Sequence, residues 1–244
     1  MNLVLDFGNT TQKMAILNGN EEVDFVRKTT LTHKDVVAFV NQHKACNVQN
    51  AILASVVPVE NKVLLFLEAN FNFIALNAQT PIPIVNKYQT PQTLGTDRLA
   101  VAIGGNAVFP HKDVLIIQMG SCITFDFINS KAEYLGGSIS PGMMMRLNAL
   151  NVFSAQLPMV EPLWTNSLMG NNTETAILTG VMQGIIDECN GKIERYKREY
   201  SNVQIILTGG DANMFKNSIK NEIFAFPNLV MFGLNRILDY NVEK

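Results

Sequence analysis

The chain has 244 residues, of which 47% are apolar and only 16% are charged. Globular proteins usually carry about 25% charged residues, so this composition excludes a disordered chain and suggests apolar surface for a partner chain. Lys and Arg number 19 and Asp and Glu number 21, giving a net charge of −2 without a basic tract, so a dedicated nucleic-acid-binding protein is not expected.

The first half of the sequence alternates predicted strands and helices. An apolar strand–turn–strand over residues 3–17 opens the chain. Strands are then predicted at 51–57 and 73–76, with a proline-punctuated loop or edge strand at 80–85. Helices are predicted at 32–46, 61–69 and 96–108, the first of them capped by Thr32.

The second half repeats this alternation. It opens with a strand at 114–117 and a second hairpin that runs to residue 127. A glycine-rich passage at 136–142 precedes a helix at 143–156, and Asn172 caps a long helix at 173–200. A strand at 203–207 and a helix at 232–240 complete the chain. Since helices follow strands repeatedly, we predict an α/β fold with mixed sheets that are flanked by helices.

The two hairpins echo one another. Residues 3–13 read LVLDFGNTTQK and residues 115–125 read LIIQMGSCITF, and their glycines Gly8 and Gly120 are 112 positions apart. This spacing is close to half the chain, which predicts a duplicated domain with halves at residues 1–112 and 113–244.

Several classes of protein lack their signatures here. The cysteines at 46, 122 and 189 and the three histidines show no metal-ligand or disulfide spacing. No apolar run approaches the roughly 18 residues that span a bilayer, and the start lacks the basic segment of a signal peptide. We therefore expect a cytoplasmic protein with free thiols, working through carboxylates, hydroxyls, amides and backbone N–H groups.

The hairpin turns are candidate phosphate sites. Asp6 is placed to hold Mg²⁺, Thr10 and Thr11 to donate to phosphoryl oxygens, and Lys13 to neutralise charge. The second turn (Gly120, Ser121, Thr124) and the loop with Gly209 and Gly210 could complete a nucleotide clamp. Ordinary solvated hairpins account for the same residues, and both interpretations stay open.

A second candidate is Asp97 at the start of the helix 96–108. A helix N-terminus keeps a carboxylate ionised, which suits a general base for a substrate hydroxyl, with Arg98 beside it for an anionic group. A solvated first-turn aspartate is the plainer explanation of the same residue.

Seven segments, in order along nearly the whole chain, resemble the type III pantothenate kinases of the actin-like ATPase superfamily. They are DFGNTTQK (6–13), YQTPQTLGTDRLA (88–100), GSCITFD (120–126), GGSISPGMMMRLNAL (136–150), AQLPMVEP (155–162), GNNTETAILTG (170–180) and ILTGGDA (206–212).

The resemblance implies duplicated ribonuclease-H-like domains and ATP-dependent phosphorylation of pantothenate, the first step towards coenzyme A. It implies Asp97 as catalytic base, with Asp6, Thr10 and Lys13 facing the phosphates and Gly120, Ser121 and Thr124 on the other side. Gly8 and Asn9 of the first turn, and Gly209 and Gly210 of the third glycine loop, complete the candidate ATP site. The implied pantothenate pocket comprises Tyr88, Gly95, Thr96 and Arg98, with Thr173 offered by the second subunit of a homodimer. Besides Mg²⁺, it implies a monovalent cation, K⁺ or NH₄⁺.

One departure from the family pattern concerns the cation. The family usually has Asp two residues before the glycine of the second turn, whereas this chain has Gln118, the echo of Asp6. A neutral amide weakens any metal site at this position. Two alternatives therefore stand beside an active pantothenate kinase: a catalytically weakened homologue that binds ligand or regulates, and a kinase for another small alcohol.

Overall fold

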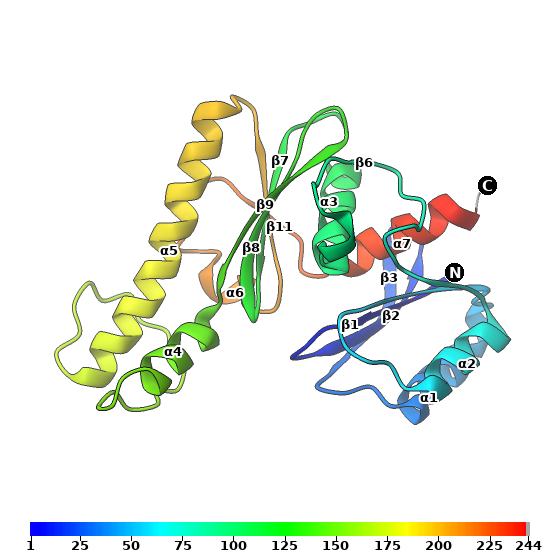
Figure 1. The fold of residues 1–244 in the computed structure, drawn as a ribbon, viewed down its shortest axis with the longest axis horizontal. Helices are drawn as coiled ribbons and strands as arrows, with labels where there is room; N and C mark the ends of the chain where they lie inside the picture. The colour runs from blue at the N-terminus through cyan, green and yellow to red at the C-terminus, as the bar shows by residue number, and fades with distance from the viewer. Residues whose placement is uncertain (243–244) are drawn as a thin grey trace. The chain divides into compact units, whose positions relative to one another are not determined.

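The computed structural model of the chain describes residues 1–242 (Figure 1). Two compact units divide it: unit 1 comprises residues 1–108, 132–134 and 228–242, and unit 2 comprises residues 109–131 and 135–227. The predicted boundary between residues 112 and 113 assigns the carboxyl-terminal helix α7 (Leu229–Val242) to the second half. In the structure α7 belongs to unit 1, because it packs on α3, β1, β2 and β4 of that unit.

The sheet of unit 1 has the strand order β3-β2-β1-β4-β5. The predicted hairpin forms from β1 (Asn2–Phe7) and β2 (Gln12–Asn18), and β3 (Glu21–Lys28) extends it antiparallel. On the other side of β1, β4 (Asn50–Ser55) and β5 (Asn72–Ala75) run parallel to it. The sequence pattern does not predict β3, because this charged edge strand has no fully buried residue.

Two helices cover one face of this sheet in Figure 1, α1 (His33–Gln42) and α2 (Asn61–Asn70). Thr32 caps α1 as predicted: its hydroxyl accepts a hydrogen bond from the backbone N–H of Asp35, whose carboxylate accepts one from the N–H of Thr32. The helix ends before the predicted residue 46, since the chain tightens into a 3₁₀ turn (Lys44–Cys46) that stops at left-handed Asn47.

On the other face of this sheet, α3 (Thr96–Val108) has the predicted bounds and packs closely on α7. A Cβ atom on Gly233 would lie 1.8 Å from the backbone oxygen of Ala100, so only glycine allows this approach. A 3₁₀ turn (Pro91–Thr93) precedes α3. Of the two alternatives predicted for residues 80–85, the loop forms over residues 80–84, and the two-residue strand β6 (Val85–Asn86) then pairs with Glu133 and Tyr134.

The second sheet has the order β11-β10-β7-β8-β9-β6. The second hairpin forms from β7 (Val114–Met119) and β8 (Cys122–Ile128), which pair antiparallel. β10 (Gln204–Thr208) runs parallel to β7, and β11 (Phe224–Ala225) parallel to β10. Most of the glycine-rich passage at 136–142 lies in strand β9 (Glu133–Pro141), which the sequence pattern did not predict.

Close approach explains the glycines of β9. A Cβ atom on Gly137 would lie 1.7 Å from the backbone oxygen of Phe125 on β8, so the neighbouring strand leaves no room for a side chain. Gly136 has a φ of 101°, a backbone conformation that glycine adopts without strain. Glycine weakens a strand in general, which is why the sequence alone did not indicate one here.

The core of unit 2 lies between the second sheet and the long helix α5 (Thr173–Glu199), which runs alongside β7, β8 and β9 in Figure 1. Asn172 caps α5 as predicted. The helix α4 (Met143–Val152) stops four residues before its predicted end, and the short helix α6 (Ala212–Phe215) follows β10.

Candidate functional site

The first hairpin carries a shielded ion pair. Asp6 and Lys13 lie opposite one another on β1 and β2, and Lys13 Nζ is 2.8 Å from Asp6 Oδ2. The side chain of Asp6 is 7% exposed and that of Lys13 is 23% exposed, so the ammonium points at a carboxylate that water scarcely reaches. The pair places a hard oxygen ligand and a positive charge side by side at the end of β1.

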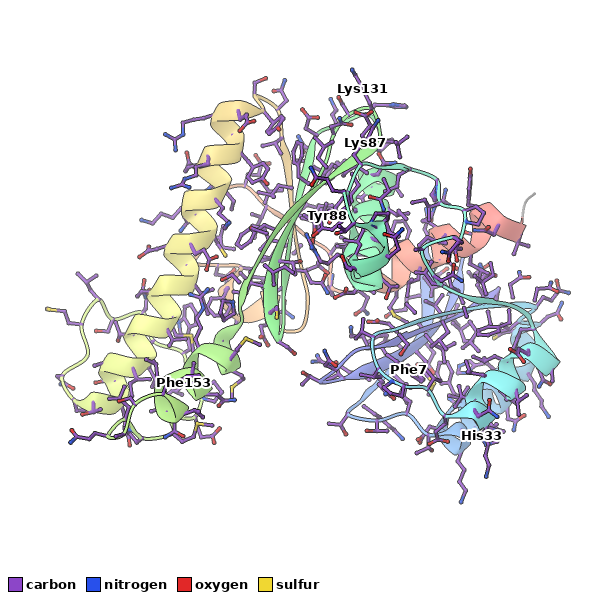
Figure 2. The ribbon with its side chains drawn as sticks, viewed as in Figure 1. Phe7, His33, Lys87, Tyr88, Lys131 and Phe153 are labelled. Carbon is purple, nitrogen blue, oxygen red and sulfur yellow. The ribbon has the colours of Figure 1, made fainter. Side chains whose placement is uncertain are left out.

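The turn beyond this pair is open. The backbone N–H of Gly8 donates to the backbone oxygen of Thr11 over 3.1 Å, and a Cβ atom on Gly8 would lie 3.0 Å from that oxygen. Asn9 and Thr10 are exposed, while Phe7, labelled in Figure 2, is buried beneath them at the end of β1. The turn can therefore present polar groups to a ligand while its base stays packed in the core.

The amino end of α3 holds Asp97 as predicted, half-buried in the first turn. Gly95 directly precedes the helix, and its backbone oxygen accepts a hydrogen bond from the N–H of Leu99. A Cβ atom on Gly95 would lie 2.6 Å from Asp97 Oδ1, so the carboxylate folds back over the helix start. The helix dipole favours the ionised form there, which is the form that a general base requires.

Arg98 lies beneath an aromatic pair. It is 6% exposed, and its guanidinium carbon lies 5.6 Å from the ring centroid of Tyr88, which Figure 2 labels. Tyr88 stacks at 6.1 Å on Tyr134, which is fully buried. Stacking holds the planar guanidinium in one orientation, and the fork of N–H groups on a guanidinium suits a planar anion such as a carboxylate.

Tyr134 is a residue that the sequence analysis missed. It enters this cluster because β9 pairs with β6, where Tyr134 lies opposite Asn86, two residues before Tyr88. No local pattern announces such a pairing between segments more than forty residues apart.

The second hairpin is neutral where the first is charged. Gln118 lies opposite Thr124 on β8 and opposite Thr208 on β10. Thr124 donates its hydroxyl to Asp126 Oδ2 over 2.8 Å, and Asp126 is fully buried. Within residues 1–242, Gln118 Oε1 is buried and has no hydrogen-bond partner.

The second turn is supported from behind by glycine. Gly142 donates its backbone N–H to the oxygen of Ser121, and a Cβ atom on Gly142 would lie 2.0 Å from the oxygen of Gly120. A Cβ atom on Gly120 itself would meet nothing within 4 Å, and Ser121 is exposed. The turn is therefore rigid on one side and open on the other.

The third glycine loop lies against the second hairpin. Gly209 has a φ of 99°, and a Cβ atom there would lie 2.1 Å from the backbone oxygen of Met119. Thr208 donates its hydroxyl to the oxygen of Pro227 over 3.1 Å. A shallow hollow opens beside this loop, lined in part by Gly209, Asn213, Lys216, Phe226 and Pro227.

The structure thus brings the predicted residues together in groups within each unit. Unit 1 pairs Asp6 with Lys13, Gly95 with Asp97, and Tyr88 with Arg98. In unit 2, Gln118, Thr124 and Thr208 lie side by side, the last of them next to Gly209. Thr173 is exposed at the start of α5, and Thr96 is half-buried at the start of α3.

The cysteines and the acidic and histidine side chains give little sign of further sites. Cys46, Cys122 and Cys189 are free thiols, and burial raises the pKa of Cys189 to about 12, which leaves it inert. Residues 1–242 hold no group of three or more His, Cys, Asp or Glu side chains suited to a metal ion. Over the same residues, every helix is too short or too polar to cross a membrane.

Two solved structures share this fold. A Campylobacter jejuni protein, which carries the name of a conserved Baf family transcriptional activator, matches with a TM-score of 0.61 at 21% identity, over 99% of this chain and all of that chain. A Streptomyces griseus ROK family glucokinase, solved with glucose and AMPPNP, matches with a TM-score of 0.52 at 10% identity, over 98% of this chain and 99% of the glucokinase.

At these identities the likeness concerns the fold alone. The chain shares with these proteins an α/β fold whose mixed sheets are flanked by helices. This confirms the predicted fold class.

The sequence comparisons are more specific. The family description of type III pantothenate kinases matches residues 2–195. Type III pantothenate kinases of Phocaeicola vulgatus and Bacteroides fragilis are each 41% identical to this chain over 242 residues. The matched residues are 99% of this chain in both cases, 99% of the Phocaeicola protein and 98% of the Bacteroides protein. The chain therefore belongs to the type III pantothenate kinase family, as its motifs predicted.

Proposed function

We propose that the groups described above carry out the reaction of this kinase family, the ATP-dependent phosphorylation of pantothenate to 4'-phosphopantothenate, the first step towards coenzyme A. The observation that carries the proposal is the amino end of α3. There a carboxylate at a helix start directly precedes a buried guanidinium under a tyrosine ring. The two neighbours suit the two ends of an acceptor that has a hydroxyl and a carboxylate.

Asp97 acts as the base in this proposal. Its carboxylate takes the proton of the acceptor's primary hydroxyl while the hydroxyl oxygen forms a bond to the γ-phosphorus of ATP. The bond from that phosphorus to the bridging oxygen breaks, and ADP leaves with the bonding electrons. Arg98 binds the acceptor's carboxylate, with Tyr88, Gly95 and Thr96 lining the pocket around it.

The ATP phosphates are assigned to the two hairpin turns. Lys13 neutralises charge, and the polar groups of Gly8, Asn9 and Thr10 donate to phosphoryl oxygens, as do those of Gly120 and Ser121. Thr124, whose hydroxyl donates to Asp126, supports this second turn from β8. Gly209 and Gly210 leave flat backbone for the nucleoside. Kinases of this family use ATP with a divalent metal, and we assign Mg²⁺ to Asp6, whose shielded carboxylate is a hard oxygen ligand. When bound, Mg²⁺ neutralises charge on the phosphates.

A monovalent cation fits less well. The position where the family usually has a carboxylate is the neutral Gln118, and no step above runs through K⁺ or NH₄⁺.

The test is ADP release with pantothenate against a panel of other small alcohols, each with and without K⁺. We expect pantothenate to be preferred by at least tenfold in kcat/KM. Equal turnover of another alcohol would favour the kinase of a different acceptor. Tight binding of pantothenate or ATP without turnover would favour the ligand-binding homologue. The observation that supports this alternative is the neutral Gln118.

We further propose a homodimer. Unit 2 exposes large apolar side chains on α4 and in the segment after it, among them Val152 (70%), Phe153 (87%), Leu168 (85%) and Met169 (79%). Figure 2 labels Phe153 at the end of α4. A Cβ atom on Gly180 of α5 would meet nothing within 4 Å, so a partner could approach the helix there. A 27.0 kDa species in sedimentation at micromolar concentration would contradict the dimer.

Thr173 would reach the partner's pocket in such a dimer. Mixing Asp97→Asn with Thr173→Ala protein should then give heterodimers with one site free of both changes, and activity should recover. No recovery after confirmed subunit exchange would rule out this role.

We also propose that the protein is cytoplasmic. The free cysteines agree with this location, because cytoplasmic thiols are kept reduced.

A further inference from the structure

We propose that Gln118 takes the place of both a carboxylate and a monovalent cation at the second turn, so that this kinase works without K⁺ or NH₄⁺. The inference rests on the proposed function, because it concerns the turn that we assign to the ATP phosphates. It goes beyond that function in stating how this chain departs from its family.

The side chain of Gln118 belongs to a polar face of the second sheet. Gln118 lies opposite Thr124 and Thr208 on the two neighbouring strands, and side chains of directly paired residues share a face. The neighbours of Gln118 in sequence, Ile117 and Met119, point the other way and belong to the core under α5. Gln118 therefore faces away from that core, one residue before the open turn at Gly120.

The groups on this face offer a cation no accessible carboxylate. Gln118, Thr124 and Thr208 are neutral, and the hydroxyls of the two threonines donate hydrogen bonds to Asp126 and to the backbone oxygen of Pro227. Asp126, the carboxylate next along the face, is fully buried and already accepts a hydrogen bond.

Charge balance explains how the site works without the ion. A carboxylate and a bound monovalent cation add up to no net charge, and a glutamine has none either. Replacing the pair by the amide therefore leaves the net charge beside the phosphates unchanged.

The amide is also not used to hold the fold together. Within residues 1–242, Gln118 Oε1 is buried without a hydrogen-bond partner. Such groups are rare in proteins, which suggests that a ligand completes this one. An amide has one acceptor and two N–H donors, and turning it about its last torsion exchanges oxygen and nitrogen. Its nitrogen can thus donate to a phosphoryl oxygen, a contact that a carboxylate makes only through a cation.

Two variants and a matched control test the proposal. Gln118→Asp restores the family's residue, and Gln118→Glu adds the charge at unchanged size. Gln204→Asp makes the same change on β10, four residues before Thr208, or ~13 Å along the strand. Rates are measured in KCl and in tetramethylammonium chloride of equal ionic strength. Thallium(I) binding, a probe for K⁺, is followed by ²⁰⁵Tl NMR with and without Mg²⁺ and AMPPNP.

We expect the kcat/KM of the unchanged protein and of Gln204→Asp to differ by less than twofold between the two salts, with no saturable thallium binding. In Gln118→Asp and Gln118→Glu, we expect K⁺ to raise kcat/KM about tenfold or more and thallium binding to saturate.

Two results would overturn the proposal. One is saturable thallium binding by the unchanged protein that K⁺ displaces, which would make the amide oxygen a cation ligand. The other is a folded Gln118→Asp and Gln118→Glu pair that gains no thallium binding. Lack of turnover by every variant in either salt would instead contradict the proposed function, and thallium binding would still decide the role of Gln118.

Discussion

The two hairpins have the same backbone plan and different charge. In each, a buried strand ends at a glycine turn and returns antiparallel, and the residue two before the glycine lies opposite a polar partner. In unit 1 that pair is Asp6 and Lys13, an ion pair, and in unit 2 it is Gln118 and Thr124, which are both neutral. The two hairpins thus share a glycine turn after a buried strand, while their side chains differ and the turns close differently: the N–H of Gly8 donates to Thr11 and that of Gly120 to Cys122.

The same contrast extends to the rest of each unit. Unit 1 carries the proposed base Asp97 and the proposed anion-binding Arg98 in addition to its ion pair. The assigned groups of unit 2 are glycines, hydroxyls and an amide. We therefore expect charge removal in unit 1 to affect catalysis more than neutral changes in unit 2.

The largest effect is expected for Asp97→Asn. Loss of a general base should lower kcat by about 10²-fold or more while the fold is kept. ADP release measures the rate, and thermal melting checks the fold. Glu68→Gln, which removes an exposed carboxylate from α2 of the same unit, should leave kcat unchanged. Undiminished turnover in folded Asp97→Asn would remove this residue from the mechanism.

The hairpins can be compared directly with Lys13→Met and Ser121→Ala. A lost charged hydrogen bond is worth about 1.5–3 kcal/mol and a neutral one about 0.5–1.5 kcal/mol. In kcat/KM for ATP, we expect a drop of roughly 10- to 100-fold for Lys13→Met and of roughly 2- to 10-fold for Ser121→Ala. A larger loss from a well-folded Ser121→Ala would reverse the contrast between the units.

Substitution of Arg98 should weaken binding of the acceptor without changing binding of the nucleotide. Arg98→Ala is expected to raise KM for pantothenate about tenfold or more, with KM for ATP nearly unchanged, because the guanidinium binds the acceptor's carboxylate. Arg98→Lys keeps the charge and should restore only part of the binding, since it lacks the planar fork. Equal changes in both KM values would count against the assignment.

The smallest effect concerns the stability of unit 1 in acid. The Lys28 ammonium, then the Thr32 hydroxyl and backbone N–H, hold the pKa of Asp35 well below its usual range. A depressed pKa stabilises the fold above the unfolded-state value of about 3.9, and this contribution is lost as the pH falls below it. Asp35→Ala should lower the free energy of unfolding by about 1 kcal/mol at pH 7, the usual worth of a helix cap.

Urea titrations from pH 7 to pH 3 measure this effect. The gap between the two proteins should narrow below about pH 4, because the unfolded state then takes up a proton on Asp35 while the folded state keeps this carboxylate ionised. A gap that stays constant over this range would mean that the ionised carboxylate contributes nothing.

Local signals determined much of this molecule. The repeated strand–glycine–strand pattern predicted both hairpins. Thr32 and Asn172 predicted the starts of α1 and α5, because a capping side chain acts on backbone only three residues away. The helix 96–108 formed with its predicted bounds, which put Asp97 and Arg98 in its first turn. The motifs also predicted the family that the comparisons confirmed.

Long-range packing decided the rest. The carboxyl-terminal helix α7 joins unit 1 because Gly233 lets it lie against α3, and Tyr134 reaches Tyr88 because β9 pairs with β6. The commitment of Thr124 to buried Asp126 and the unpaired oxygen of Gln118 likewise depend on what surrounds them in space. Sequence patterns record which side chains prefer burial or a turn, but the partner that each one meets is set by the packing of distant segments.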